Sequence, residues 1–346
     1  MAQDKDFCGD PILSVRNLEV VLKTAVGELQ ATRGISFDIC PGETFAIVGE
    51  SGCGKSISSM ALMGLLPRIA KARAEHCVFD GHEILNMSRR QLSGIRGNTL
   101  SMIFQDPMTS LNPVYTIGDQ LTEVFLRHGK GNAKEARDRA VFLLERVGIK
   151  NASERLNAYP HQLSGGLRQR VVIAMAMMCS PKLIIADEPT TALDVTVQMR
   201  TLALLSELQK EFGLAIILIT HDLGVVASLS DRVAVMYAGQ IVETAPTRQL
   251  FADPMHPYTQ GLIQCIPSYA PPNADAELHT IPGMVPALIG RQKGCAFRNR
   301  CALADGDCAK GDEILMREFG AGHGYRCLRS EDALCENWRS LQGEPA

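Results

Sequence analysis

Residues 45–56 read FAIVGESGCGKS, and residues 57–66 continue ISSMALMGLL up to Pro67. The apolar run Phe45–Val48 predicts a short buried strand, and Ile57–Leu66 predicts a helix that Pro67 ends. The turn between them has the spacing Gly-x-x-x-x-Gly-Lys-Ser, which is typical of a phosphate-binding loop when it joins a strand to a helix. The residues of this loop are Gly49, Glu50, Ser51, Gly52, Cys53, Gly54, Lys55 and Ser56.

The residue types of this loop suit a nucleoside triphosphate. Glycines allow backbone N–H groups to curl around phosphates, and the start of a helix adds partial positive charge. Lys55 can reach the β- and γ-phosphates, and the Ser56 hydroxyl can bind Mg²⁺. The alternative is a chance match to the spacing, and the flanking strand and helix count against it.

A second apolar run ends in two acids. Leu183–Ala186 predicts a strand, followed by Asp187 and Glu188. Asp187 would hold Mg²⁺ through water, and Glu188 would orient or deprotonate the attacking water. An acidic pair that only caps a strand is the alternative for these residues alone. Together with the loop at 49–56, they predict binding and hydrolysis of a nucleoside triphosphate.

The order of elements favours a doubly wound α/β fold. Leu183–Ala186 and Ala215–Ile219 are apolar without alternation, as expected for parallel strands covered on both faces. Val195–Phe212 is long enough for the crossover helix between them, while Ala133–Val147 and Val171–Met178 predict further helices. After residue 250 seven prolines fall within residues 254–286 and exclude a long regular helix there. We expect a nucleotide-binding body followed by an irregular tail that contains cysteines.

Composition limits the class of protein. The chain has 346 residues, 46% hydrophobic and 21% charged, with a net charge of −3, so no strong basic field indicates nucleic acid. The N-terminal residues lack the apolar segment of a signal peptide, and no apolar run approaches the length of a membrane span. We expect a soluble intracellular protein whose 11 cysteines are mostly free thiols. Any membrane role would come through a partner.

Further motifs resemble the ATP-binding cassette (ABC) family over about residues 12–250. Leu163-Ser164-Gly165-Gly166 is similar to the family signature, and Gln105 in IFQDP to its Q-loop glutamine. Residues 191–194, which read TALD, resemble the D-loop, and His221 in ITHD resembles the switch histidine. Taken singly, each has a plain structural interpretation as a loop glutamine, a turn or a structural histidine. Their order along one chain favours the family.

The resemblance implies a P-loop NTPase core in which two cassettes pair head to tail. A helical subdomain at about residues 106–170 would lie within the nucleotide-binding domain, residues 12–250. The residues expected to serve the chain's own ATP are Lys55, Ser56, Gln105, Asp187, Glu188 and His221. Among these, Glu188, His221 and Gln105 are the expected catalytic residues, and Ser56, Gln105 and Asp187 the expected Mg²⁺ ligands. Those expected to serve the partner's ATP are Ser164, Gly165, Gly166 and Asp194.

One position departs from the family pattern. Family members stack adenine on an aromatic residue near the end of the first strand, but residues 8–36 contain no Phe, Tyr or Trp. Leu22 stands at about this place. We therefore expect looser, aliphatic packing of the base, with stacking weaker by about 1 kcal/mol.

Three further stretches resemble the dipeptide/oligopeptide/nickel importer group: residues 106–113 (DPMTSLNP), 256–259 (HPYT) and 294–301 (GCAFRNRC). The resemblance implies a peripheral ATPase on the cytoplasmic face of a bacterial inner membrane. Its expected partners are two permease subunits, a second ABC ATPase that is a homologue or a copy, and an extracytoplasmic solute-binding protein. Nucleic acid is not an expected partner. Residues 251–346 would form the group's C-terminal extension.

The extension contains Cys295, Cys301, Cys308 and Cys327, whose spacing fits neither a paired C-x-x-C zinc ribbon nor a ferredoxin. The resemblance implies that these four hold a [4Fe–4S] cluster. Zinc, and thiols without a metal, stay open as alternatives. The cysteines left over are expected to be small buried apolar residues: Cys8, Cys40, Cys77, Cys179, Cys265 and Cys335.

Two other functions compete with the importer. One is a soluble ABC ATPase of translation or DNA repair, and the other is a redox or iron sensor built on the cysteines. Translation factors of the family carry two cassettes in one chain, and the repair proteins carry a long coiled coil; neither feature is present here.

Overall fold

The computed structural model describes residues 9–191, 194–266, 280–286, 288–290, 292–311 and 313–343. The chain divides into two compact units. The first contains residues up to 38, 45–85 and 220 onward, and the second contains residues 39–44 and 86–219. The C-terminal extension therefore belongs to the same unit as the phosphate-binding loop.

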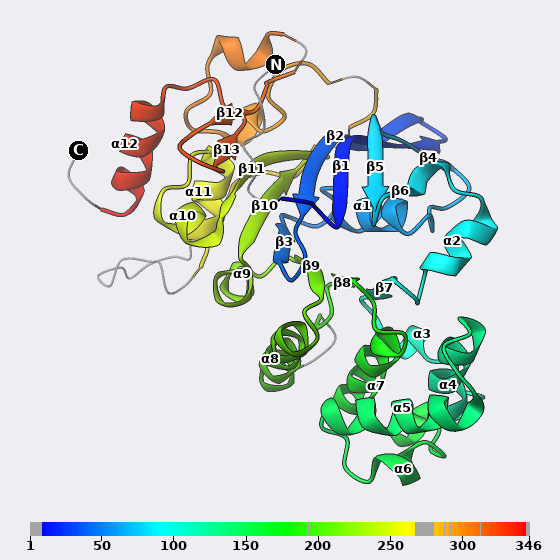
Figure 1. Cartoon of the computed structure of the whole chain (residues 1–346). Coiled ribbons are helices and arrows are strands. Elements are labelled where there is room, and N and C mark those ends of the chain that lie inside the picture. The colour runs from blue at the N-terminus through cyan, green and yellow to red at the C-terminus, as the bar shows by residue number, and fades with distance from the viewer. Residues whose placement is uncertain are drawn as a thin grey trace. The chain divides into compact units, whose positions relative to one another are not determined.

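The first unit is built on two sheets (Figure 1). Its strands are β1 (Leu13–Thr24), β2 (Gly27–Ile39), β3 (Thr44–Val48), β4 (Ala70–Arg73), β5 (His76–Phe79), β6 (His82–Glu83), β10 (Arg232–Tyr237), β11 (Gln240–Pro246), β12 (Arg317–Glu318) and β13 (Gly324–Tyr325). Its helices are α1 (Lys55–Leu62), α9 (Leu223–Leu229), α10 (Thr247–Ala252), α11 (Pro257–Gln264) and α12 (Glu331–Leu341). Short 3₁₀ turns lie at η1 (Ile84–Asn86), η4 (Arg298–Arg300) and η5 (Gly306–Ala309).

The two sheets of this unit differ in strand direction. The first has the order β2-β1-β5-β6, with β4 also paired to β1, and its β1–β4, β1–β5 and β5–β6 pairs are antiparallel. The second has the order β12-β13-β11-β10-β3, in which β10 and β3 are parallel and the other pairs antiparallel. All five residues of β3 are buried, which explains the unbroken apolar run that predicted it. The long strands β1 and β2 were not predicted.

The helix after the phosphate-binding loop is shorter at its end than predicted. It begins at Lys55, two residues before the expected start, and ends at Leu62 instead of Leu66. Gly64 follows in a left-handed conformation with φ +58°. A left-handed glycine just beyond the last turn ends a helix, so Gly64 rather than Pro67 explains the boundary.

The second unit carries a parallel sheet and a group of helices (Figure 1). Its strands are β7 (Leu100–Ile103), β8 (Leu183–Asp187) and β9 (Ala215–Thr220), paired in the order β9-β8-β7 and all parallel. Its helices are α2 (Arg89–Ile95), α3 (Pro107–Ser110), α4 (Ile117–Arg127), α5 (Ala133–Arg146), α6 (Ala152–Arg155), α7 (Gly165–Met177) and α8 (Val195–Phe212), with a 3₁₀ turn η2 at Pro160–Gln162. The predicted strands β8 and β9 and the crossover helix α8 are confirmed.

Helices α4, α5 and α7 pack on one another, and α3 packs on α7. The buried face of α5 consists of Ala136, Ala140, Leu143 and Leu144, and Gly148 follows the helix with φ +77°, as expected for a C-terminal cap. Helix α7 starts at Gly165, six residues before the predicted start at Val171.

The C-terminal extension packs on the other elements of the first unit. Phe297 and Trp338 belong to one hydrophobic core with Val48 of β3 and Tyr237 of β10. The Trp338 Nε1 also donates to the carbonyl of Ala252 at 2.9 Å. The described residues of the extension include helices α11 and α12, and they share a hydrophobic core with β3, the strand that leads into the phosphate-binding loop. Within the described part of the chain, no helix has the length and apolarity to span a membrane.

Candidate nucleotide-binding site

Two glycines of the phosphate-binding loop leave no room for a side chain. Gly49 has φ +153° and Gly54 has φ +107°, both outside the usual range of other residues. A Cβ at Gly49 would lie 2.1 Å from the carbonyl oxygen of Met236, and one at Gly54 would lie 2.3 Å from that of Ala31. The loop backbone therefore packs directly against neighbouring backbone.

Lys55 is folded over this loop. Its side chain is buried, and Nζ donates to the carbonyl oxygens of Gly49 at 2.8 Å and Glu50 at 3.0 Å. Helix α1 begins at Lys55, so Ser56 lies in its first turn, where the helix dipole favours a negative group. The structure thus brings the predicted lysine and serine to the positive end of a helix.

Glu50 has partners that the sequence did not reveal. Its N–H donates to the hydroxyl oxygen of Tyr258 at 3.0 Å, and its carboxylate accepts two hydrogen bonds from Arg300 at 2.8 and 3.0 Å. Both partners lie in stretches, HPYT and GCAFRNRC, that were noted only for their resemblance to importer proteins. No local pattern links them to the loop.

The acidic pair of the second unit ends β8. Asp187 is 4% exposed, and Glu188 follows it with φ +45°, a left-handed conformation that is uncommon for a non-glycine residue. The Glu188 N–H donates to the carbonyl of Ile219 on β9 at 2.9 Å. Its carboxylate oxygen Oε2 accepts from Thr191 Oγ1 at 2.8 Å and from Gln105 Nε2 at 3.2 Å. The structure therefore brings two of the predicted catalytic residues, Gln105 and Glu188, into contact.

The signature residues open helix α7. Ser164 is its N-cap, with Oγ accepting from the Leu167 N–H at 3.4 Å, and Gly165 and Gly166 form the first turn. Gly166 packs closely on α8, since a Cβ there would lie 2.9 Å from a methyl carbon of Val197. The buried Gln169 Nε2 donates to the carbonyl of Pro189, immediately after Glu188, at 2.7 Å. Gln169 was not predicted as a site residue, and it joins the signature helix to the Glu188 segment.

Three further predicted nucleotide-site residues lie at the ends or on the surfaces of strands and helices. Asp194 is the N-cap of α8 and accepts from the Val197 N–H at 3.0 Å, while Ala192 and Leu193 of the same motif lie outside the described residues. His221 is exposed and directly follows β9. Leu22 is half-buried on β1, opposite Ala70 of β4. Their expected contacts with nucleotide stay predictions.

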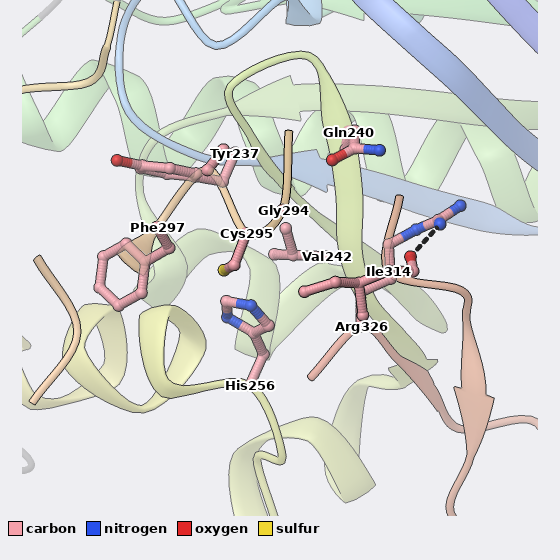
Figure 2. Close-up of a pocket in the computed structure, with 10 residues that line it drawn as sticks. Tyr237, Gln240, Val242, His256, Gly294, Cys295, Phe297, Ile314 and Arg326 are labelled. Carbon is pink, nitrogen blue, oxygen red and sulfur yellow. Dashed lines mark hydrogen bonds between the residues drawn. The ribbon is translucent and has the colours of Figure 1, made fainter. Parts of the chain in front are cut away.

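The four cysteines of the extension meet at one cavity. Cys295, Cys301, Cys308 and Cys327 all line it, together with Leu303. Burial raises the pKa of Cys301 to about 11, with smaller contributions from the thiols nearby. Figure 2 shows an adjoining pocket, where Cys295 points toward the ring of His256 beside Phe297. Within the described ranges, no group of three or more His, Cys, Asp or Glu side chains has the arrangement for one metal ion.

The remaining cysteines only partly follow expectation. Cys53, Cys77 and Cys179 are free and buried, and burial raises the pKa of Cys77 to about 12. Cys265 and Cys335 are free but partly exposed. Cys40 is disulfide-bonded, which corrects the expectation of a free thiol there.

Comparison with known proteins identifies the family of the chain. A family described as "ABC transporter" matches residues 32–191, and one described as "Oligopeptide/dipeptide transporter, C-terminal region" matches residues 242–308. The chain is 52% identical over 293 residues to the dipeptide transport ATP-binding protein DppD of Bacillus subtilis, covering 84% of this chain and 87% of that protein. The chain belongs to the ATP-binding proteins of the peptide ABC transporter family.

Other relatives of this ABC ATPase agree. It is 46% identical over 323 residues to the oligopeptide transport ATP-binding protein OppD of Salmonella typhimurium, covering 93% of this chain and 95% of that protein. The solved ATP-binding cassette MJ0796, in a dimeric post-hydrolysis state with ADP and Pi, matches with a TM-score of 0.61 and 27% identity, covering 68% of this chain and 99% of that one. CbiO1 of Clostridium perfringens matches with a TM-score of 0.60 and 31% identity, covering 71% and 92%. The predicted ABC fold and ATPase class are confirmed.

Proposed function

We propose that this ABC ATPase binds MgATP and that its hydrolysis energises the import of dipeptides, oligopeptides or a related small solute. The single observation that carries the proposal is the pairing of both family matches on one chain, a cassette at residues 32–191 and a peptide-transporter extension at 242–308. The phosphate-binding loop and the Gln105–Glu188 contact supply the chemistry. Nothing in the described residues or in the relatives favours a translation, repair or sensor function.

The proposed reaction is attack of water on the γ-phosphate. Glu188 orients the water and accepts its proton; the bond to the β,γ-bridging oxygen breaks, and ADP leaves with that electron pair. Lys55 balances charge on the β- and γ-phosphates, and His221 contacts the γ-phosphate. The contacts of Glu188 with Gln105 and Thr191 support its role, because they fix the carboxylate in one orientation.

Magnesium fits the residues expected to hold it. Ser56, Asp187 and Gln105 offer hydroxyl, carboxylate and amide oxygens, the ligand types that Mg²⁺ prefers. When bound, the ion neutralises part of the charge on the β- and γ-phosphates. The Asp187 side chain is nearly inaccessible to solvent, which favours a fixed ligand over a mobile one.

The proposed partner in hydrolysis is a second cassette, a copy or a homologue. Ser164 and Gly165 are exposed at the start of α7, so this helix end is open to an incoming γ-phosphate. Asp194 would approach the same ATP molecule, the one bound by the partner cassette.

The proposed membrane partners are two permease subunits, served by an extracytoplasmic solute-binding protein. A pocket in the second unit is lined by Arg96, Asn112, Tyr115, Gln120, Arg127 and His128. Tyr115 is 55% exposed and its neighbour Val114 is 73% exposed. Exposed apolar side chains beside a polar pocket suit the docking of a short permease helix. The ATP-driven closure of the two cassettes would be transmitted to the permease at this pocket. The chain would then lie peripherally on the cytoplasmic face of a bacterial inner membrane.

We propose an iron–sulfur cluster as the cofactor of the extension. Four buried or half-buried thiols line one cavity, and a cluster needs four thiolates around a body larger than one ion. Iron and acid-labile sulfide, measured on anaerobically purified protein, test this. Zinc in their place supports the zinc alternative, and no metal supports free thiols.

Uptake of a panel of labelled dipeptides, oligopeptides and nickel complexes, in cells lacking this chain, tests the transport function. Loss of peptide uptake, restored by the wild-type chain, is expected. Co-purification with two multispanning proteins supports the importer, and their absence from a purified active complex contradicts it.

A further inference from the structure

The C-terminal extension holds the phosphate-binding loop at Glu50 from two sides. Tyr258, 208 positions later in the chain, accepts a hydrogen bond from the backbone N–H of Glu50 at 3.0 Å. Arg300, 250 positions later, donates two hydrogen bonds to its carboxylate at 2.8 and 3.0 Å. These contacts fix both the backbone and the side chain of one loop residue.

Arg300 is itself fixed by other contacts. Its side chain is only 6% exposed, and it also donates to the carbonyl oxygens of Pro282 at 2.8 Å and Ile281 at 3.2 Å. Its guanidinium carbon lies 5.7 Å from the centre of the Tyr237 ring and 5.9 Å from that of Phe297. A paired guanidinium with so many partners has one orientation, so it can hold Glu50 in one place.

Tyr258 is equally constrained. It is completely buried, with ring centres 4.6 Å from Tyr237 and 5.3 Å from Phe297. Burial raises the pKa of the Tyr258 hydroxyl, so the group stays neutral and accepts from Glu50 without placing a charge in the core.

Glu50 is also hydrogen-bonded to other residues of the phosphate-binding loop. Its carbonyl oxygen accepts from Lys55 Nζ at 3.0 Å and from the Cys53 N–H at 3.3 Å. The residue held by the extension is thus also in contact with the phosphate-binding lysine and with the turn of the loop.

We propose that Arg300, assisted by Tyr258, is a positioning residue of the ATP site that acts through Glu50. It keeps the loop backbone in the curvature that receives phosphates, so the extension completes the nucleotide site. A loop that is already ordered loses less conformational freedom on binding, so loss of this support weakens MgATP affinity more than the chemical step. The inference rests on the proposed ATPase function.

The test is a double-mutant cycle of Arg300→Lys and Glu50→Gln in the full-length chain. Arg300→Lys keeps the positive charge but loses the bidentate hydrogen bond to the Glu50 carboxylate. We expect it to raise the MgATP Kd and KM by about tenfold. We expect kcat to change by less than about twofold, because the reacting groups are untouched. The MgATP affinity of the double variant should be no lower than that of the single variant that binds more weakly, because both substitutions remove the same interaction.

Arg298→Lys is the matched control. Arg298 lies in the same η4 turn, but its guanidinium donates to the carbonyls of Lys293 and Cys295 within the extension. We expect its MgATP Kd to equal that of the wild type. If Arg300→Lys does not fold, Tyr258→Phe carries the test, because it deletes only the hydroxyl that Glu50 donates to and should raise Kd by about fivefold.

An unchanged Kd in a folded Arg300→Lys variant overturns the inference, as do effects of Arg300→Lys and Glu50→Gln that simply multiply. An equal loss of affinity in Arg298→Lys also overturns it, because the effect would then come from general loosening of the extension. Wild-type protein that binds no MgATP contradicts the proposed function and this inference together. Wild-type binding with an unaffected Arg300→Lys variant contradicts the inference alone.

Discussion

The side-chain amide of Gln105 donates from Nε2 to Oε2 of Glu188 at 3.2 Å. Gln105 follows β7 and Glu188 follows β8, so two neighbouring parallel strands deliver them to the same edge of the sheet. The contact links the expected Mg²⁺ ligand of the Q-loop to the expected general base. If the helices that follow Gln105 moved, this contact would transmit the movement to the Glu188 carboxylate.

Replacing the proposed general base should stop turnover without preventing binding. We expect Glu188→Gln to lower the rate of ATP hydrolysis by about a hundredfold or more, because the amide cannot accept the proton of water. Phosphate release and MgATP affinity, measured on the same preparation, check this. Glu207→Gln is the control, since Glu207 is an exposed acid on α8. Turnover near the wild-type rate in Glu188→Gln would mean that another group is the base.

Removing the partner of Glu188 should have a smaller effect. In Gln105→Ala, Thr191 still donates to the carboxylate, so we expect kcat to fall by about tenfold rather than being lost. Steady-state kinetics at saturating MgATP measure it. A Gln105→Ala variant with wild-type kcat would show that the contact does not orient Glu188 during catalysis.

The glycines of the loop should differ in their tolerance of a methyl group. Gly49→Ala places a Cβ 2.1 Å from a backbone oxygen, so we expect loss of MgATP binding or of the fold. Gly52 has φ +79° but no heavy atom within 4 Å of its Cβ position, so Gly52→Ala should lower stability by about 1 kcal/mol through backbone strain alone. Thermal unfolding and nucleotide titration distinguish the two. Equal effects would contradict the close approach at Gly49.

The proposed cluster at the cysteine cavity predicts which cysteine variants lose bound iron. We expect Cys308→Ser to lose bound iron and acid-labile sulfide, because it would remove one of the four proposed cluster ligands. Cys335→Ser should keep both, since Cys335 is not among the residues that line the cavity. Elemental analysis of anaerobic preparations provides the measurement. Iron at background in the wild type would remove the cluster assignment.

Local chemistry made the elements that carry the candidate ATP site predictable. The loop 49–56 is glycine-rich and joins a strand to a helix, and Leu183–Ala186 of β8 form an unbroken apolar run because this strand is buried. Helix α8 has the predicted bounds because Asp194 caps its start and Gly213, with φ +63°, ends it. Such signals lie within a few residues of the elements that they define.

The contacts of Glu50 could not be predicted in the same way. Arg300 and Tyr258 lie far along the chain, and an arginine or tyrosine in an irregular segment has no pattern that names its partner. Helix α7 begins earlier than predicted because its continuous apolar stretch starts only at Val171, whereas Ser164 caps the helix before the two glycines. Tertiary packing and capping decided these features.

The central claim is that ATP bound at Lys55 drives solute import, and uptake by a lysine variant tests it most directly. Labelled peptide uptake is measured in cells lacking this chain and complemented with wild type, Lys55→Ala or the control Lys71→Ala, whose lysine is exposed on β4. We expect uptake with wild type and Lys71→Ala, and none with Lys55→Ala, which should bind no MgATP. Wild-type uptake with Lys55→Ala would contradict the account, because the transporter would then run without this ATP site.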